Sequence, residues 1–243
     1  MSKCTFTYSH YAEIFRTAIL EDYQIITLAD WFQGRYDSNR KVLVNRIDVD
    51  DNIQRLWPMA DIFRKLGIRT SIFLRLHARG YNLLFHDNIS LVRRLLADGH
   101  EVGLHAEIVD VQHICGLDPT LTLRAEVTLF RDLLGANPQG VASHGDMTPY
   151  NNLDFWKDHV PSEFGLLYEA YDQPLWGNSR YVSDSEYTRW KAYEDGVLRK
   201  EDRRCACEHI RDGVAVLYLL THTCSWYAMH IHEQTPRTPT VPL

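Results

Sequence analysis

The sequence predicts an α/β protein built around a parallel sheet. Short apolar segments of strand length alternate along the chain with amphipathic segments of helix length. Glycines follow several of the helical segments, where a left-handed residue commonly ends a helix. No linker-like stretch divides the 243 residues, a length that one domain accommodates. We therefore expect a single domain over residues 1–243.

The first half of the chain alternates regularly. The apolar segment "VLVNRIDV" begins at Val42 and is predicted to be a buried strand that runs into carboxylates. The segment "NIQRLWPMADIFRKLG" has apolar residues at helical spacing, and Gly67 stands where that helix should end. The strand "RTSIFLRL", the helix "NISLVRRLLADG" and the strand "HEVGLHAE" are expected to follow.

The second half is less regular. The segment "LTLRAEVTLFRDLLG" is predicted to be a helix, "GVASHG" a strand, and "GVAVLYLLTH" a strongly apolar last strand. Between them, residues 150–200 are rich in Trp, Tyr and Asn and indicate long loops with short strands such as "FGLLYEAYD". Three prolines in residues 233–243 predict a flexible or loosely draped tail.

Composition argues against several classes of partner. The net charge is −6 and no basic cluster is present, so nucleic-acid binding is not expected. The N-terminal segment lacks the apolar core of a secretion signal, and no apolar run reaches membrane-spanning length. Five cysteines without CxxC spacing are typical of reduced thiols in a cytoplasmic protein. Cys205 and Cys207 alone would make a poor metal site, which favours ordinary thiols.

Polar side chains gather where the apolar strands end. The residues concerned are Asp48, Asp50, His105, Glu107, His144 and His222. In parallel sheets the carboxyl ends of the strands meet at one edge, where sites are commonly built. We therefore expect these side chains to converge on one site.

The residue types at that edge indicate a metal. Asp48 and Asp50 are two apart on a strand, so their side chains leave the same face and repel each other. A divalent cation would relieve the repulsion, and imidazole with carboxylate is a ligand set for zinc or another first-row metal. One aspartate would bind the ion while the other stays ionised and acts as a base.

These segments resemble a known family. The stretch "VNRIDVDDNIQRLWPMADIFRKLGIRTSIFLRL", followed by "LADGHEVGLHAE" and the late "LYLLTHTCSWY", is similar to the polysaccharide deacetylase family, also called NodB-homology or carbohydrate esterase family 4. The Asp-x-Asp form of the first motif resembles the divergent branch associated with lipopolysaccharide and O-antigen loci. The resemblance covers about residues 40–228.

The resemblance implies a distorted, incomplete (β/α) barrel. It also implies metal-dependent removal of an acyl group, usually acetyl, from a sugar nitrogen. Carried over by position, Asp48 resembles the catalytic base, and Asp50 and His105 resemble metal ligands. His222 resembles the late histidine that acts as general acid or supports the oxyanion.

The chain departs from the family pattern at the second metal histidine. That residue usually follows the first by four positions, where this chain has Val109. His144, Glu107 and Asp110 are the alternatives that could complete the site, and we favour His144 because it restores an Asp-His-His set. The segment "SHGDMTPY" lies where the family often has an Arg-Pro motif, with His144 in place of the arginine.

We therefore expect a cytoplasmic, zinc-dependent N-deacetylase that acts on an acylated amino sugar of a surface-polysaccharide or lipopolysaccharide precursor. The residues assigned to substrate binding are Arg46, Glu107, Asp146 and Trp226. Further candidate sugar platforms are Trp156, Tyr168, Tyr171, Trp176 and Trp190. The alternative is a catalytically degenerate protein that binds a saccharide or a partner, which the missing histidine at position 109 favours. The oligomeric state is not predicted.

Overall fold

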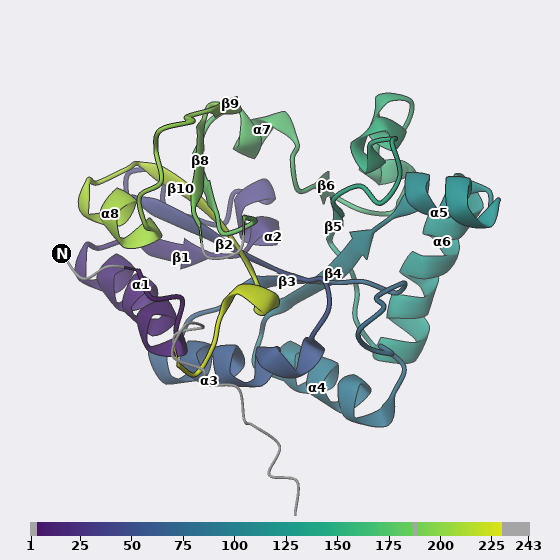
Figure 1. The fold of residues 1–243 in the computed structure, drawn as a ribbon, viewed down its shortest axis with the longest axis horizontal. Coiled ribbons are helices and arrows are strands. Elements are labelled where there is room, and N and C mark those ends of the chain that lie inside the picture. Colours follow the sequence, from purple (N-terminus) through teal and green to yellow (C-terminus); the bar gives the residue numbers. More distant parts are fainter. Residues whose placement is uncertain (1–3, 187–188, 230–243) are drawn as a thin grey trace, which may run out of the picture.

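The structure, a computed structural model, describes residues 4–186 and 189–229 (Figure 1). The predicted tail at 233–243 lies outside these residues. Eight of the described strands run parallel: β1 Gln24–Ile26, β2 Val42–Val49, β3 Ser71–Leu74, β4 Glu101–Ala106, β5 Gly140–Ser143, β6 Tyr168–Glu169, β7 Arg180–Ser183 and β10 Val216–His222. Two more, β8 Lys191–Glu194 and β9 Val197–Leu198, extend the sheet antiparallel.

The strands form one curved sheet that does not close. Their order is β6-β5-β4-β3-β2-β10-β7-β8-β9. Strand β2 lies at the centre, and one of its edges pairs with β1 near Val42 and with β3 from Arg46 onward. Its other edge pairs with β10 along the whole strand. Because β6 and β9 end the sheet without pairing to each other, the barrel is incomplete, as predicted.

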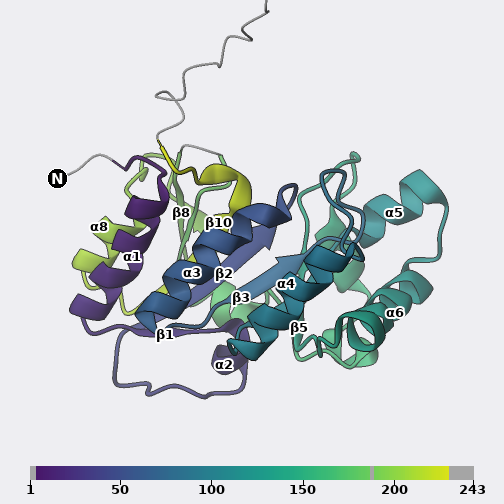
Figure 2. The same ribbon diagram turned by 90° about the horizontal axis from the view of Figure 1, so that it is seen from below.

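Most of the helices cover one face of the sheet, whereas two short ones, α2 and α7, pack against the other face. The α-helices are α1 Tyr8–Leu20, α2 Leu28–Phe32, α3 Leu56–Leu66, α4 His86–Ala97, α5 Ile108–Cys115, α6 Pro119–Leu129, α7 Gln173–Trp176 and α8 Ala206–Arg211. The shorter turns are η1 Ile53–Arg55, η2 Phe130–Leu134, η3 Asn152–Lys157, η4 Pro161–Phe164 and η5 Thr223–Ser225. Figure 2 shows α1, α3 and α4 side by side against the sheet. Among the described residues, no helix combines the length and the apolar character that crossing a bilayer requires.

Several predicted elements are confirmed and others are shorter or divided. The strand at Val42 and the helix ended by a left-handed Gly67 are both present. The helix predicted over residues 121–135 begins two residues earlier and changes to a π-helical turn at Phe130. The segment "FGLLYEAYD" contributes only the two residues of β6. Helices α1, α5 and α8 were not predicted.

Alternation along the strands divides the interior into two cores. On β2, Leu43, Ile47 and Val49 pack into a core beneath the helices. Val42 and Val44 point to the other face of the sheet. That face is lined by a second core, which we call the inner core, and which includes Phe73, Tyr168, Tyr181, Tyr218 and Leu220.

The same alternation positions the site. After Val42 and Val44, the next two residues on the inner face of β2 are Arg46 and Asp48. On β10 the inner face carries Tyr218 and Leu220, and then His222. The inner face therefore changes from apolar to charged toward the carboxyl ends of the strands.

The start of β5 leaves no room for a side chain. A Cβ atom on Gly140 would overlap the ring of Tyr168, which is fully buried in the inner core. We expect Gly140→Ala to lower the free energy of unfolding by about 1–3 kcal/mol, the usual effect of overpacking, in a urea titration. Gly145→Ala is the matched control because nothing lies within 4 Å of a Cβ there. Equal stabilities of the two variants would contradict this packing.

Candidate metal centre and active site

A cavity of about 300 Å³ opens at the carboxyl ends of the parallel strands. Its first wall is formed by Asp48, Asp50, His105, Ser143, His144 and His222. Its second wall is aromatic and consists of Tyr171, Trp176, Tyr181 and Tyr193, with Ser185 and Lys191 beside them. The predicted convergence of strand ends therefore creates one cavity with a charged side and an aromatic side.

Asp48 is held by a buried arginine from its own strand. Arg46 Nε donates to Asp48 Oδ1 at 2.8 Å and Arg46 Nη2 to Oδ2 at 2.6 Å, while both residues are almost completely buried. Arg46 Nη1 donates to the hydroxyl of Tyr218 at 2.9 Å, and the guanidinium lies over the ring of Tyr171. Burial opposes ionisation of Asp48, but the charge on Arg46 outweighs it and lowers the pKa of the carboxyl.

Three side chains from three segments form a potential ligand group. Asp50 Oδ1 lies 3.3 Å from His105 Nε2 and 3.7 Å from His144 Nε2. The ligand atoms of Asp50, His105 and His144 all lie within 4.8 Å of one another. Asp50 follows β2, His105 is on β4, and His144 follows β5. Each segment thus contributes one ligand at the same rim.

The polar atoms of this group fit a divalent cation. Asp50 Oδ1 is buried and has no hydrogen-bond partner among the described residues. His105 Nδ1 lies 2.9 Å from the carbonyl oxygen of Ala142, which fixes the proton on Nδ1 and leaves the Nε2 lone pair directed at the carboxylates. An orphaned carboxylate oxygen facing an imidazole lone pair is the arrangement that a cation would satisfy.

The alternatives for the third ligand have other partners. Arg75 binds Glu107 through two hydrogen bonds, Nε to Oε2 at 3.0 Å and Nη2 to Oε1 at 2.5 Å. Asp110 Oδ2 accepts hydrogen bonds from Asn152 Nδ2 and the backbone of Met147. These carboxylates form a separate group with His144 that does not include His105. The geometry therefore favours His144 in the group with Asp50.

The electrostatics suit an ionised Asp50 beside a neutral His144. Burial would raise the pKa of Asp50, but the neighbouring His105, His222 and His144 hold the pKa below its ordinary value. Burial lowers the pKa of His144 to about 4, and the charge on Arg75 acts in the same direction. Asp50 is thus an anion near neutral pH, and His144 keeps a free lone pair.

His222 is positioned by a carboxylate that the sequence analysis did not identify. Its Nδ1 lies 2.6 Å from Asp184 Oδ1, and Trp226 Nε1 donates to Asp184 Oδ2 at 2.8 Å. Burial alone would lower the pKa of His222, but the charge on Asp184 raises it to about 9. The other ring nitrogen, Nε2, lies 4.0 Å from Asp50 Oδ2. The cavity therefore holds a cationic imidazole beside the carboxylate of Asp50.

The four residues assigned to substrate binding lie outside the lining of the cavity. Arg46 and Trp226 are completely buried, and Glu107 is engaged by Arg75, so none of the three is free to contact a substrate. Asp146 is exposed and accepts a hydrogen bond from the backbone of Asn152, outside the cavity lining. Of the aromatic candidates, Tyr171 and Trp176 line the cavity, whereas those outside its lining are Trp156, Tyr168, Trp190 and Trp226.

The residues of the site that the sequence analysis did not identify lie within residues 150–200, the region predicted to hold long loops and short strands. Asp184 and Ser185 follow β7, and Lys191 and Tyr193 belong to β8. The segment "RYVSDS" does have the signal of an apolar strand that ends in polar residues. It is only four residues long as a strand, and the aromatic loops around it hide its periodicity.

No family model and no curated protein matches this chain. Among solved structures, it is similar to a family 4 carbohydrate esterase from Streptomyces lividans in complex with acetate, with 15% identity over 74% of this chain and 79% of the other and a TM-score of 0.43. The chitin deacetylase of Colletotrichum lindemuthianum gives 16% identity, 76% and 75% coverage and a TM-score of 0.44. IcaB from Ammonifex degensii gives 16% identity, 61% and 70% coverage and the same TM-score. At such values the chemistry of this chain has to be derived from its own residues.

The contact between His222 and Asp184 can be tested directly. We expect Asp184→Asn to lower the pKa of His222 from about 9, because the largest of the charges that offset burial is removed. An NMR titration of the His222 ring protons measures this shift. Asp146→Asn, which neutralises an exposed carboxylate outside the cavity, should leave the pKa unchanged. An unaltered pKa in Asp184→Asn would show that Asp184 does not control His222.

Proposed function

We propose that this protein is a metal-dependent hydrolase that removes an acyl group, in particular N-acetyl, from an amino sugar. One observation carries the proposal. The group formed by Asp50, His105 and His144 lies in one cavity between an arginine-bound carboxylate, Asp48, and a carboxylate-bound imidazole, His222. A site with metal ligands, a base and an acid has the parts that amide hydrolysis needs.

The three ligands suit zinc. Asp50, His105 and His144 would hold the ion and leave a position open for water and substrate, as catalytic zinc sites do. When bound, the ion supplies a Lewis acid that polarises the acyl carbonyl and makes water more acidic. The hydrogen bond from His105 Nδ1–H to the Ala142 carbonyl fixes the orientation of the ring. His105 Nε2 is therefore directed toward the ion position before any ion binds.

The remaining steps belong to the two flanking groups. Asp48 lines the cavity, and its Oδ2 lies 3.3 Å from His105 Nε2, so it can accept a proton from a water in the ligand group. Arg46 holds that carboxylate in place through both oxygens. On the opposite side, His222 can donate from Nε2 to the departing amine, because Asp184 occupies Nδ1.

The aromatic wall supports a sugar as the acyl carrier. Tyr171, Trp176, Tyr181 and Tyr193 present rings to the cavity, and the apolar face of a pyranose packs well on such rings. Ser185 and Lys191 add polar groups suited to hydroxyls. The finer assignment, a surface-polysaccharide or lipopolysaccharide precursor as substrate, is supported by the sequence resemblance.

Acetate release tests the function. Protein loaded with Zn²⁺ is incubated with N-acetylated amino-sugar oligosaccharides and nucleotide-linked N-acetylhexosamines, and free acetate is measured. We expect Asp48→Asn to slow release by roughly 10² to 10⁴ while the metal content stays unchanged, because only the base is removed. If wild type binds these sugars and releases no acetate from any of them, the protein is the saccharide-binding alternative instead.

The role of His144 is tested by metal affinity. As the third ligand, its replacement in His144→Ala should weaken zinc binding at the cavity by orders of magnitude, and added zinc should partly restore activity. Competition with a chromogenic chelator measures the affinity. His77→Ala is the matched control, because His77 is a half-exposed histidine paired with Glu126 outside the cavity. Wild-type zinc affinity in His144→Ala would remove it from the ligand set.

A further inference from the structure

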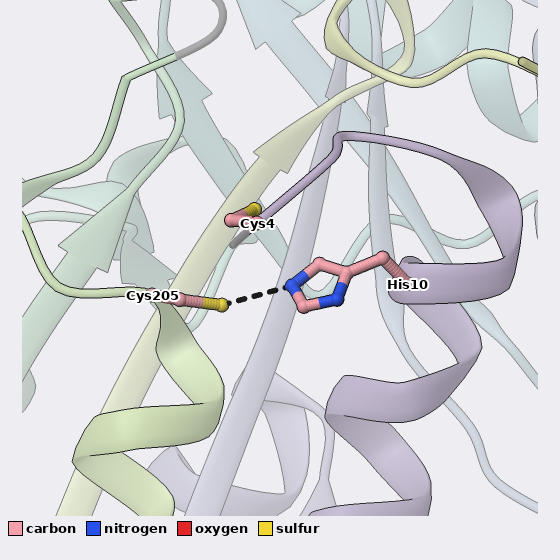
Figure 3. Close-up of side chains that lie close together, drawn as sticks. All are labelled: Cys4, His10 and Cys205. Carbon is pink, nitrogen blue, oxygen red and sulfur yellow. Dashed lines mark hydrogen bonds between the residues drawn. The ribbon is translucent and has the colours of Figure 1, made fainter. Parts of the chain in front are cut away.

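A second group of metal-binding side chains lies away from the cavity. Cys4 precedes α1, His10 lies in its first turns, and Cys205 is the N-cap of α8 (Figure 3). Figure 3 shows the three side chains gathered between these two helices. None of them lines the cavity described above. The fold thus joins residues that are about 200 positions apart in the sequence.

The spacing of these groups matches a tetrahedral zinc site. The ligand atoms of Cys4, His10 and Cys205 lie within 4.8 Å of one another, and His10 Nε2 is 3.1 Å from Cys205 Sγ. Zinc–sulfur bonds of about 2.3 Å place two sulfurs of a tetrahedral site roughly 3.8 Å apart. The thiol of Cys205 also interacts with those of both Cys4 and Cys207. A third thiol is therefore adjacent, and Cys205, Cys207 and His10 are all buried.

The surroundings orient the potential ligands. His10 Nδ1 lies 3.0 Å from Glu13 Oε2, so Nδ1–H donates a hydrogen bond to the carboxylate and the Nε2 lone pair faces Cys205. This carboxylate–histidine arrangement is the one that orients histidine ligands in zinc proteins. Trp190 Nε1 donates to Cys4 Sγ at 3.2 Å, a hydrogen bond that favours a thiolate.

We propose that Cys4, His10 and Cys205 bind a structural zinc ion. Two thiolates and one imidazole supply three of the four ligands that a structural zinc site uses, and Cys207 is a further thiol beside Cys205. The sequence alone favoured ordinary thiols because only Cys205 and Cys207 are near each other along the chain; the fold adds Cys4 and His10.

The ion would fasten the N-terminal segment to the body of the protein. Phe6, between Cys4 and α1, packs on the rings of Trp190 at 5.5 Å and Trp226 at 5.3 Å. Trp226 in turn donates to Asp184, which positions His222. Zinc bound by Cys4, His10 and Cys205 would therefore stabilise the side-chain packing behind His222 in the cavity.

Cobalt separates this site from the one in the cavity. Reduced protein, stripped with a chelator, is titrated anaerobically with Co²⁺, and the near-ultraviolet thiolate-to-cobalt charge-transfer band is recorded. Only a site with cysteine ligands gives this band, so its presence does not depend on the proposed function. We expect the band in wild type and in His105→Ala, and its loss in Cys205→Ser. The exposed Cys115 provides the control variant Cys115→Ser, which should keep the band.

A second variant guards against loss of folding. Glu13 is partly exposed, so Glu13→Gln should fold normally. It should weaken cobalt binding to Cys4, His10 and Cys205 by roughly 10- to 100-fold, the usual effect of removing a carboxylate behind a ligating histidine. Cobalt binding to wild type without a charge-transfer band would overturn the proposal. Two further results, found together, would also overturn it. The first is a disulfide among Cys4, Cys205 and Cys207 in protein purified without oxidant. The second is the absence of zinc from His105→Ala, the variant that lacks a ligand of the cavity site.

Discussion

The ion pair between Arg46 and Asp48 is the constraint on which the rest of the site depends. Both side chains lie inside the sheet, and a buried carboxylate or guanidinium without a partner would destabilise the fold by several kcal/mol, about 3–5 for a broken pair. The pair is fully bonded, because two guanidinium nitrogens contact Asp48 and the third contacts Tyr218. Because the pair is fully hydrogen-bonded, the inner face of β2 can change from the apolar Val42 and Val44 to the charged Arg46 and Asp48.

That arrangement sets the order of the groups above it. Asp48 lies beside His105, His105 beside Asp50, and Asp50 beside His144 and His222. Anionic and imidazole groups therefore alternate across the cavity, which limits the repulsion between the two aspartates. Among the described residues, two buried atoms of this network lack a hydrogen bond, Asp50 Oδ1 and His144 Nδ1. A cation bound at Asp50 would satisfy the first of them.

The same logic extends behind the cavity. His222 is held by Asp184, Asp184 by Trp226, and Trp226 packs against Tyr11 and Phe6 from the N-terminal segment. Tyr11 also hydrogen-bonds Thr221, the neighbour of His222. Residues far from the cavity thus position its imidazole through direct contacts. The cluster of Cys4, His10 and Cys205 adjoins Phe6, the residue of this series that is farthest from His222 along these contacts.

Much of the architecture follows from local patterns in the sequence. Strand and helix periodicity predicted the alternation from Val42 onward, because burial of one face is imposed residue by residue. The same reasoning predicted that Asp48, Asp50, His105, Glu107, His144 and His222 would meet, since parallel strands bring their carboxyl ends to one edge. All of them except Glu107 line the cavity. Short elements with little periodicity of their own, such as β7 and α8, were beyond such patterns.

The sequence by itself determined which strand ends carry charged side chains and that these ends share an edge. Only the tertiary structure decided what each side chain contacts. It placed Arg46 on Asp48 instead of on a substrate, paired Glu107 with Arg75, and set Asp184 behind His222. It also brought Cys4 and His10 to Cys205. The physical reason is that a polar group's partner depends on distances across the fold, which spacing along a chain does not encode.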